Sequence, residues 1–170
     1  MALLTICTYP DPVLREKARC VDIIDNGIQC LIDDMIDTMY DAPGIGLAAT
    51  QVGRPLSLLI VDIKREECGY GLIVLINPEL VSARGEITFE EGCLSVPDFF
   101  ANVKRHEEIV VCGLERDGKK IEIAASGLLA IALQHEMDHL EGKLFIDHIS
   151  PIARDIFKRK WKKKSKEERE

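Results

Sequence analysis

Features of membrane and secreted proteins are missing from this sequence, and so is the paired-cysteine motif of redox and metal sites. No stretch approaches the roughly 18 consecutive apolar residues that a membrane-spanning helix needs. The residues from Met1 to Cys7 carry no charged group before an apolar run, so they do not resemble a secretory signal peptide. The six cysteines include no CxxC pair. These absences predict a cytoplasmic protein with free thiols and no membrane partner.

Positive charge is also scarce over most of the chain. The sequence has 22 lysines and arginines against 29 aspartates and glutamates, a net charge of −7. An acidic surface of this kind argues against nucleic-acid binding over the whole molecule. The end of the chain is the exception, because residues 158–170 hold eight basic and three acidic groups, a net +5 that leaves −12 on the rest. This basic tail on an acidic body suggests a binding partner for the tail.

Apolar periodicity and helix-start signals together predict three helices. Apolar residues between Ile28 and Met39 recur at steps of three and four, and Pro43 cannot continue the helix that they indicate. A serine or a proline marks the start of each of the second and third helices. The helices are expected at residues 25–40, at residues 127–140 with Ser126 as the cap, and from Ser150-Pro151 onward.

Short β-rich runs lie between the first two predicted helices. They occupy residues 58–63, 72–76, 109–112 and 121–123. Asp117-Gly118 is a hairpin turn signal between the last two of them. Because the strands cluster instead of alternating with helices, the pattern favours an α+β fold with antiparallel sheets over a parallel, doubly wound sheet.

The strongest chemical signal is the sequence HEMDH from His135 to His139. Two histidines four residues apart share one face of a helix and can hold one metal ion. The glutamate between them can act as general base on a water that the metal activates. The run Leu128–Leu133 just before is almost wholly apolar, so we expect this helix to be central, with the antiparallel sheets packed around it. Buried histidines without a partner are costly, which favours a metal site over a chance motif.

The third metal ligand decides the class of enzyme. The metzincin pattern HExxHxxGxxH fits through Gly142 and then fails, because its last position is Phe145. Downstream acidic residues are poor candidates, since Glu141 is close in the chain and the tail is expected to be solvated. Upstream, Cys93 follows a glycine and offers a thiolate, which suits Zn²⁺ or Fe²⁺. A lone cysteine is more often a small buried apolar residue, but beside an HExxH helix that lacks a ligand Cys93 is the better choice.

A glycine- and alanine-rich loop follows the first predicted helix, at residues 44–51 with the sequence GIGLAATQ. It is not the GxGxxG fingerprint of a dinucleotide-binding fold, because Ala49 stands at the last glycine position and no strand ends directly before the loop. Taken alone, the segment indicates only a tight turn with closely packed small residues.

Together these segments resemble the peptide deformylase family. The motifs of that family are a glycine–alanine loop ending in glutamine, an EGCLS segment and QHExDH. They stand here in full and in order at residues 44–51, 91–95 and 134–139, and the similarity extends to Pro10–Leu14. The resemblance implies a metal-dependent hydrolase that removes the N-formyl group from the N-terminal methionine of nascent polypeptides.

The resemblance also implies how the reaction is divided among residues. Glu136 would take a proton from water and later pass it to the leaving amine. The side-chain amide of Gln51 and the backbone N–H of Leu94 would stabilise the oxyanion. The site would hold one divalent ion with water as its fourth ligand. The resemblance implies Fe²⁺, with Zn²⁺ or Ni²⁺ as alternatives. The three protein ligands would be Cys93, His135 and His139.

The substrate would be an N-formylmethionyl nascent peptide. Gly46 would lie against its backbone, and Ile45, Leu128 and Ile131 would line a pocket for the methionine side chain. Plain core packing is the alternative for Leu128 and Ile131, and periodicity does not separate the two.

Two other functions compete with this one, and the tail adds a partner. The first alternative is a metallopeptidase that uses the same HExxH helix, and the second is a non-catalytic binding module with a structural metal.

The expected organisation is a single catalytic domain over residues 1–161, which includes most of the C-terminal helix, and a basic tail over residues 162–170. Because nascent chains emerge from an RNA-rich surface, the tail is a candidate for docking on the ribosome, with a merely solubilising role as the alternative.

Overall fold

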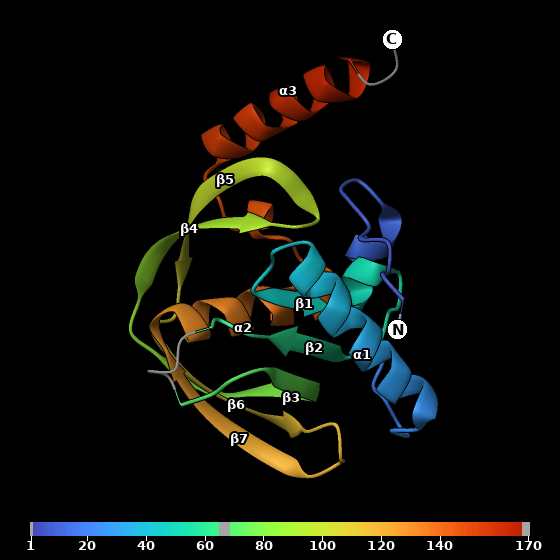
Figure 1. The fold of residues 1–170 in the computed structure, drawn as a ribbon. Coiled ribbons are helices and arrows are strands. Elements are labelled where there is room, and N and C mark those ends of the chain that lie inside the picture. Colours follow the sequence, from blue (N-terminus) through green and yellow to red (C-terminus); the bar gives the residue numbers. More distant parts are fainter. Residues whose placement is uncertain (1, 65–68, 168–170) are drawn as a thin grey trace.

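The computed structural model describes residues 2–64 and 69–167, which fold into two antiparallel sheets with helices around them (Figure 1). Cys68 and the last three residues of the predicted tail lie outside the described residues. The main elements in chain order are α1 (Asn26–Asp41), β1 (Gly46–Ala48), β2 (Leu58–Val61), β3 (Ile73–Arg84), β4 (Ile87–Cys93), β5 (Val96–Arg105), β6 (Glu108–Leu114), β7 (Lys120–Ser126), α2 (Gly127–Leu140) and α3 (Pro151–Glu167).

The larger sheet has the strand order β1-β2-β3-β6-β7, and every neighbouring pair is antiparallel. The smaller sheet is the antiparallel pair β4–β5. In Figure 1, α2 runs between the two sheets, α1 crosses beside β1 and β2, and α3 lies over β5. The predicted α+β class is confirmed, with antiparallel sheets around the HExxH helix and a further helix at the C-terminus.

Helix α1 forms where the apolar periodicity predicts it, within one residue at each end. The Asp25 side chain accepts a hydrogen bond from the backbone N–H of Ile28 at 3.0 Å, which caps the first turn. Ile32, Met35 and Met39 are fully buried against the larger sheet. The helix therefore covers one side of the larger sheet. The glycine–alanine segment at residues 44–51 includes β1 of this sheet.

Helix α2 has the predicted bounds, but one detail of its start was wrong. The Ser126 side chain makes no capping hydrogen bond, although Ser126 stands at the cap position. The helix begins directly from β7, so its position follows from the strand and from burial rather than from a serine cap. Nine of its 14 residues are buried, as the apolar run before the HExxH motif requires.

Helix α3 starts at Pro151, as predicted, where the hydroxyl of Ser150 accepts a hydrogen bond from the N–H of Ala153 at 3.2 Å. Phe157 is buried and its ring lies 5.2 Å from the ring of Tyr9. In the sequence, Ile152, Ala153, Ile156, Phe157 and Trp161 predict an apolar stripe that packs the helix against the body, and that prediction was wrong in part. Ile152 and Ile156 are 75% and 46% exposed, because the body covers only the neighbouring face of the helix.

The cysteines of the described residues, Cys7, Cys20, Cys30, Cys93 and Cys112, are free. No helix within the described ranges combines the length and the apolar character that crossing a bilayer requires.

Candidate metal centre and its cavity

Two histidines of α2 and one cysteine of β4 converge at one point. His135 and His139 lie one turn apart on α2, and Cys93 is the last residue of β4. One ligand atom from each residue lies within 4.8 Å of the others, and the Sγ atom of Cys93 is 3.3 Å from Nε2 of His139. Zinc, for example, takes nitrogen at about 2.0–2.1 Å and sulfur at about 2.3 Å, so one ion can reach all three atoms.

The chemistry of these donors fits a divalent metal ion. Burial and the positive field of His135 lower the pKa of His139 well below its ordinary value, so this imidazole is neutral, as metal binding requires. Burial would also lower the pKa of His135, but hydrogen bonds to Cys93 and Glu91 raise it, and a bound cation would take the place of that proton. A thiolate and two imidazoles suit ions such as Zn²⁺ and Fe²⁺. The group is consistent with one divalent ion.

A buried carboxylate fixes the orientation of His135. Nδ1 of His135 lies 2.8 Å from Oε2 of Glu91, which leaves Nε2 for the metal. Arg105 donates two hydrogen bonds to the same carboxylate, at 2.7 Å and 3.0 Å. Burial would raise the pKa of Glu91, but the hydrogen bonds from His135 and Arg105 lower it, so Glu91 is ionised. A carboxylate behind a metal-binding histidine holds the ring in place and makes its other nitrogen more basic.

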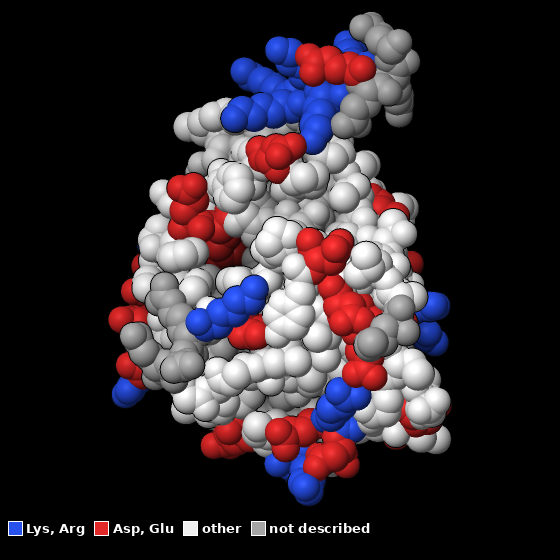
Figure 2. All heavy atoms as spheres, in the orientation of Figure 1, with Lys and Arg blue, Asp and Glu red and all other residues white. Residues whose placement is uncertain are grey.

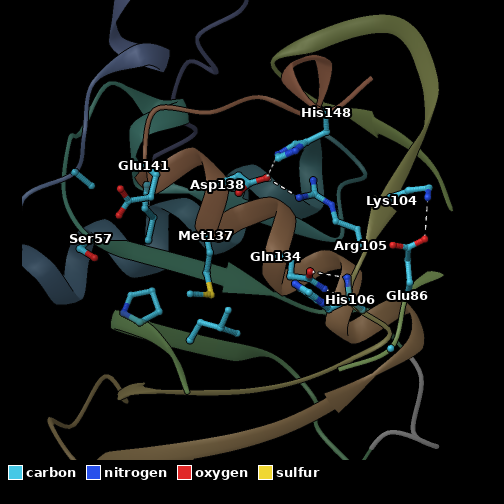
Figure 3. Close-up of a pocket in the computed structure, with 15 residues that line it drawn as sticks. Ser57, Glu86, Lys104, Arg105, His106, Gln134, Met137, Asp138, Glu141 and His148 are labelled. Atoms are coloured by element: carbon cyan, nitrogen blue, oxygen red, sulfur yellow. Dashed lines mark hydrogen bonds and ion pairs between the residues drawn. The ribbon is translucent and has the colours of Figure 1, made fainter. Parts of the chain in front are cut away.

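Arg105 extends this network to Asp138, on the face of α2 next to the metal donors (Figure 3). It donates from Nη1 to Asp138 at 2.6 Å, and Oδ2 of Asp138 lies 2.7 Å from Nε2 of His148. Burial would raise the pKa of Asp138, but the hydrogen bonds and charges of His148 and Arg105 lower it. These residues border a hollow of about 560 Å³, on the face of α2 that carries Gln134. The network is thus buried behind the metal donors and reaches solvent at His148.

Glu136 lies directly against the backbone of Gly46 in β1. A Cβ atom at Gly46 would be 2.5 Å from Oε1 of Glu136, so only glycine permits this approach. The other oxygen, Oε2, is buried and has no hydrogen-bond partner among the described residues. Burial raises the pKa of Glu136 to about 7. A carboxyl group with a free oxygen and this pKa can both accept and return a proton near neutral pH.

The side-chain amide of Gln51 is held in one orientation. Its Oε1 accepts from the N–H of Ala48 at 2.8 Å, and its Nε2 donates to the hydroxyl of Ser95 at 3.1 Å. Nε2 also lies 3.6 Å from Sγ of Cys93. The amide nitrogen is thereby directed at the metal donors. Leu94, the residue after Cys93, packs its side chain against Gly44, where a Cβ atom would be only 2.8 Å away.

A cavity of about 470 Å³ opens beside these groups. Ile131 is buried and Leu128 half-buried in its wall, while Ile45 is 42% exposed. His139 is the one expected site residue that does not line the cavity, because it is buried beneath it. The residues expected at the site that do line it are Ile45, Gly46, Gln51, Cys93, Leu94, Leu128, Ile131, His135 and Glu136.

The charged residues behind His135 have no clear signal in the sequence. Glu91 stands within the EGCLS segment, and Arg105 stands in a Lys-Arg-His run that resembles ordinary surface charge. Asp138 offered a signal, because a second carboxylate within the HExxH motif of a largely buried helix needs a cationic partner. The identity of that partner depends on pairing β5 with β4, which the spacing along the chain does not reveal.

An HExxH helix between antiparallel sheets, with a thiolate and a buried carboxylate beside it, defines the class of metal-dependent hydrolases. Comparison with known proteins gives the family. The family model for polypeptide deformylases matches residues 3–155. The peptide deformylase of Syntrophobacter fumaroxidans is 68% identical over 167 residues, which cover 98% of each chain. This chain belongs to the peptide deformylase family.

Solved structures agree with this assignment. The crystal structure of a peptide deformylase from Legionella pneumophila matches with a TM-score of 0.90 and 48% identity, over 98% of each chain. That of peptide deformylase from Ehrlichia chaffeensis in complex with actinonin matches with a TM-score of 0.90 and 40% identity, over 96% of this chain and 98% of the other.

Proposed function

We propose that this protein removes the N-formyl group from the N-terminal methionine of nascent polypeptides and releases formate. The observation that carries the proposal is the convergence of Cys93, His135 and His139 within 4.8 Å, beside the buried and unpartnered oxygen of Glu136. Membership of the peptide deformylase family supplies the reaction. The roles of the individual residues are those that the family resemblance implies, and the geometry of the site supports them.

Glu136 moves the proton in this scheme. A divalent ion on Cys93, His135 and His139 would activate water and polarise the formyl carbonyl. Glu136 accepts the proton of the attacking water at Oε2 and passes it to the methionine nitrogen as the C–N bond breaks. Gly46 lets this carboxyl group stand at the edge of β1, where the substrate backbone would lie.

The negative charge that develops on the formyl oxygen needs donors that are already in place. Nε2 of Gln51 is one, because its carbonyl end is fixed by Ala48. The backbone N–H of Leu94 is the second. A preorganised donor of this kind contributes about 2.7–4 kcal/mol to stabilising the transition state. Gln51 carries no charge, so it offers a donor without competing as a metal ligand.

The methionine side chain would occupy the apolar part of the cavity. Ile45, Leu128 and Ile131 supply its wall, and a flexible thioether adapts to such a surface. The formyl hydrogen is small, so a closely packed end of the cavity would exclude larger acyl groups.

Two peptides separate this proposal from the metallopeptidase alternative. We expect formate release from a formyl-Met peptide and no cleavage of a peptide blocked at both ends, with the wild-type protein and one bound ion per chain. Backbone cleavage of the blocked peptide without formate release would contradict the proposal. A non-catalytic module with a structural metal would act on neither.

The native ion is proposed to be Fe²⁺, with Zn²⁺ and Ni²⁺ as the other ions that the donor set accepts. A thiolate-bound ferrous ion is expected to be sensitive to oxygen. Activity of protein purified under nitrogen should therefore decay in air, in parallel with its iron content. Full activity after prolonged aeration, with zinc as the bound metal, would contradict iron.

The basic tail is proposed to dock the enzyme on the ribosome. An enzyme that acts at the ribosome would work in the cytoplasm, which is the location we propose. In Figure 2 the lysines and arginines gather over α3, while acidic groups and uncharged surface dominate the rest of that face. Lys162, Lys163 and Lys166 are exposed, whereas Lys164 is half-buried and bound to Asp98 at 2.8 Å. We therefore propose the boundary between catalytic domain and tail near Trp161, with Lys164 the one tail lysine that contacts the body.

This contact sets the design of the docking test. Replacing Lys162, Lys163 and Lys166 by alanine removes the exposed charges but keeps the pair between Lys164 and Asp98. We expect weaker ribosome binding with a shallower salt dependence, by roughly 2–3 in the slope of log K against log salt, and unchanged formyl-Met-peptide kinetics. Alanines at three exposed lysines elsewhere are the matched control: Lys17, Lys119 and Lys120. Equal ribosome affinity for both variants and the wild type at low salt would overturn the docking proposal.

A further inference from the structure

The short segment between α1 and β1 forms part of the wall of the metal-site cavity. Pro43, Gly44 and Ile45 line the cavity together with Gly46, the first residue of β1. Ile45 is 42% exposed, so core packing does not fix its side chain. A wall residue that is not buried depends on its backbone for its position. The contacts that this segment makes with the rest of the fold therefore decide where the wall lies.

Asp62, the residue directly after β2, contacts both ends of this segment. Its backbone N–H donates to the carbonyl oxygen of Ile45 at 2.8 Å, which continues the pairing of Gly46 with Val61 by one residue. Its Oδ2 accepts a hydrogen bond from the hydroxyl of Tyr40, in the last turn of α1, at 2.5 Å. Asp62 thus joins the end of α1 and the start of β1 to the end of β2.

Both carboxylate oxygens of Asp62 have a donor. Oδ1 accepts from the backbone N–H of Lys64 at 2.8 Å, and Nζ of Lys64 lies 5.2 Å from the centroid of the Tyr40 ring. The hydrogen bond to Asp62, together with burial, raises the pKa of Tyr40 to about 12. The phenol therefore stays protonated and remains the donor at neutral pH. We call the pair of Tyr40 and Asp62 the latch.

The latch is separate from the groups that carry the reaction. Neither Tyr40 nor Asp62 lines the cavity, so both act on a substrate only through the segment that they hold. Gly46 is held independently of the latch, because it pairs with Val61 and lies against Glu136. Loss of the latch is therefore expected to loosen the segment before Gly46 and to leave the catalytic carboxyl group in place.

We propose that Tyr40 and Asp62 are positioning residues for the methionine side chain of the substrate. Their hydrogen bond holds Ile45 in the position that completes the pocket wall, so the wall does not have to be ordered when a substrate binds. Without the latch only a fraction of the molecules has the wall in place, and the apparent affinity for a methionine side chain falls by that fraction. This inference rests on the proposed deformylase activity and adds two residues that determine its specificity.

Two formylated dipeptides test the latch, formyl-Met-Ala and formyl-Ala-Ala, because an alanine side chain is too short to use the pocket wall. We expect Tyr40→Phe to raise KM for formyl-Met-Ala about three- to tenfold, with kcat and the kinetics of formyl-Ala-Ala within about twofold of wild type. Asp62→Asn keeps an acceptor for the phenol and should show a smaller effect. Asp62→Ala should match Tyr40→Phe, and combining the two should cause no further change, because the residues act as one unit.

The control and the outcomes separate this inference from the activity itself. Tyr9→Phe removes the same hydroxyl from a ring that packs on Phe157 and Trp161, and it is expected to leave the kinetics of both peptides unchanged. Equal kinetics for Tyr40→Phe and wild type, or an equal loss for both peptides, would overturn the positioning role while the deformylase activity stands. No formate from either peptide with the wild-type protein would instead contradict the proposed function.

Discussion

Helices α2 and α3 follow one another in the chain and have similar lengths, but their surroundings are opposite. Nine of the 14 residues of α2 are buried, whereas Phe157 is the one buried residue among the 17 of α3. One face of α2 carries the metal donors, and the face next to it carries Asp138 within the Arg105 network. α3 touches the body along a single stripe. The difference teaches that a helix that builds a site is defined by contacts on every side, while an outer helix depends on a few anchoring residues.

The largest expected effect is at the catalytic face of α2. Glu136→Gln keeps the size of the side chain and the Gly46 contact but removes the proton acceptor. We expect the bound ion to remain and kcat for formate release to fall by roughly 10²–10⁴-fold. Metal analysis and steady-state kinetics on the same sample measure both. A near-normal rate would exclude Glu136 as the group that moves the proton.

The network beside the metal donors is tested through Arg105. Arg105→Met leaves the buried carboxylate of Glu91 and the half-buried one of Asp138 without this cation, and we expect a loss of about 3–5 kcal/mol in the free energy of unfolding. Arg116→Ala is the matched control, because its ion pair with Asp33 is half exposed at 3.0 Å and is expected to contribute about 0–1 kcal/mol. Urea denaturation measures both. Equal losses for the two variants would mean that the buried network does not hold the site together.

The anchor of α3 is expected to give a smaller effect. Phe157→Ala opens a cavity among Tyr9, Phe99 and Trp161, and we expect a loss of about 3 kcal/mol. Ile152→Ala, on the exposed face of the same helix, is expected to change stability by less than about 0.5 kcal/mol. Thermal unfolding followed by circular dichroism compares them. A large effect of Ile152→Ala would show that α3 is covered on both faces, and the contrast with α2 would fail.

The sequence predicted α1 and α2 almost to the residue, because the apolar periodicity of α1 is strong, the start of α2 is a continuous apolar run, and Pro43 and Gly142 mark their ends. It did not predict β4 and β5. The buried residues of β5 include Val96, Phe99 and Val103, whose spacing of three and four is that of a helix rather than a strand. In β4 the one buried side chain is Glu91, a carboxylate, so no apolar alternation marks the strand. Both strands form because they pair with each other and pack on the rest of the fold, and the spacing of residues along the chain does not reveal that pairing.

The same division holds for the site. The HExxH motif and Cys93 can be recognised in the sequence by their chemistry, and the structure places them together. The supporting residues cannot be recognised in this way, because the contacts of Arg105 with Glu91 and Asp138 depend on the pairing of β5 with β4 and its packing on α2.

Whether Cys93 holds the metal is decided by the metal content of Cys93→Ala, purified under nitrogen beside Cys112→Ala. Both variants lose one half-buried thiol, but only Cys93 lies among the metal donors. The account predicts one ion per chain and normal formate release for Cys112→Ala, and the loss of tightly bound metal and of activity for a folded Cys93→Ala. A Cys93→Ala protein that keeps one ion per chain and full activity would contradict it.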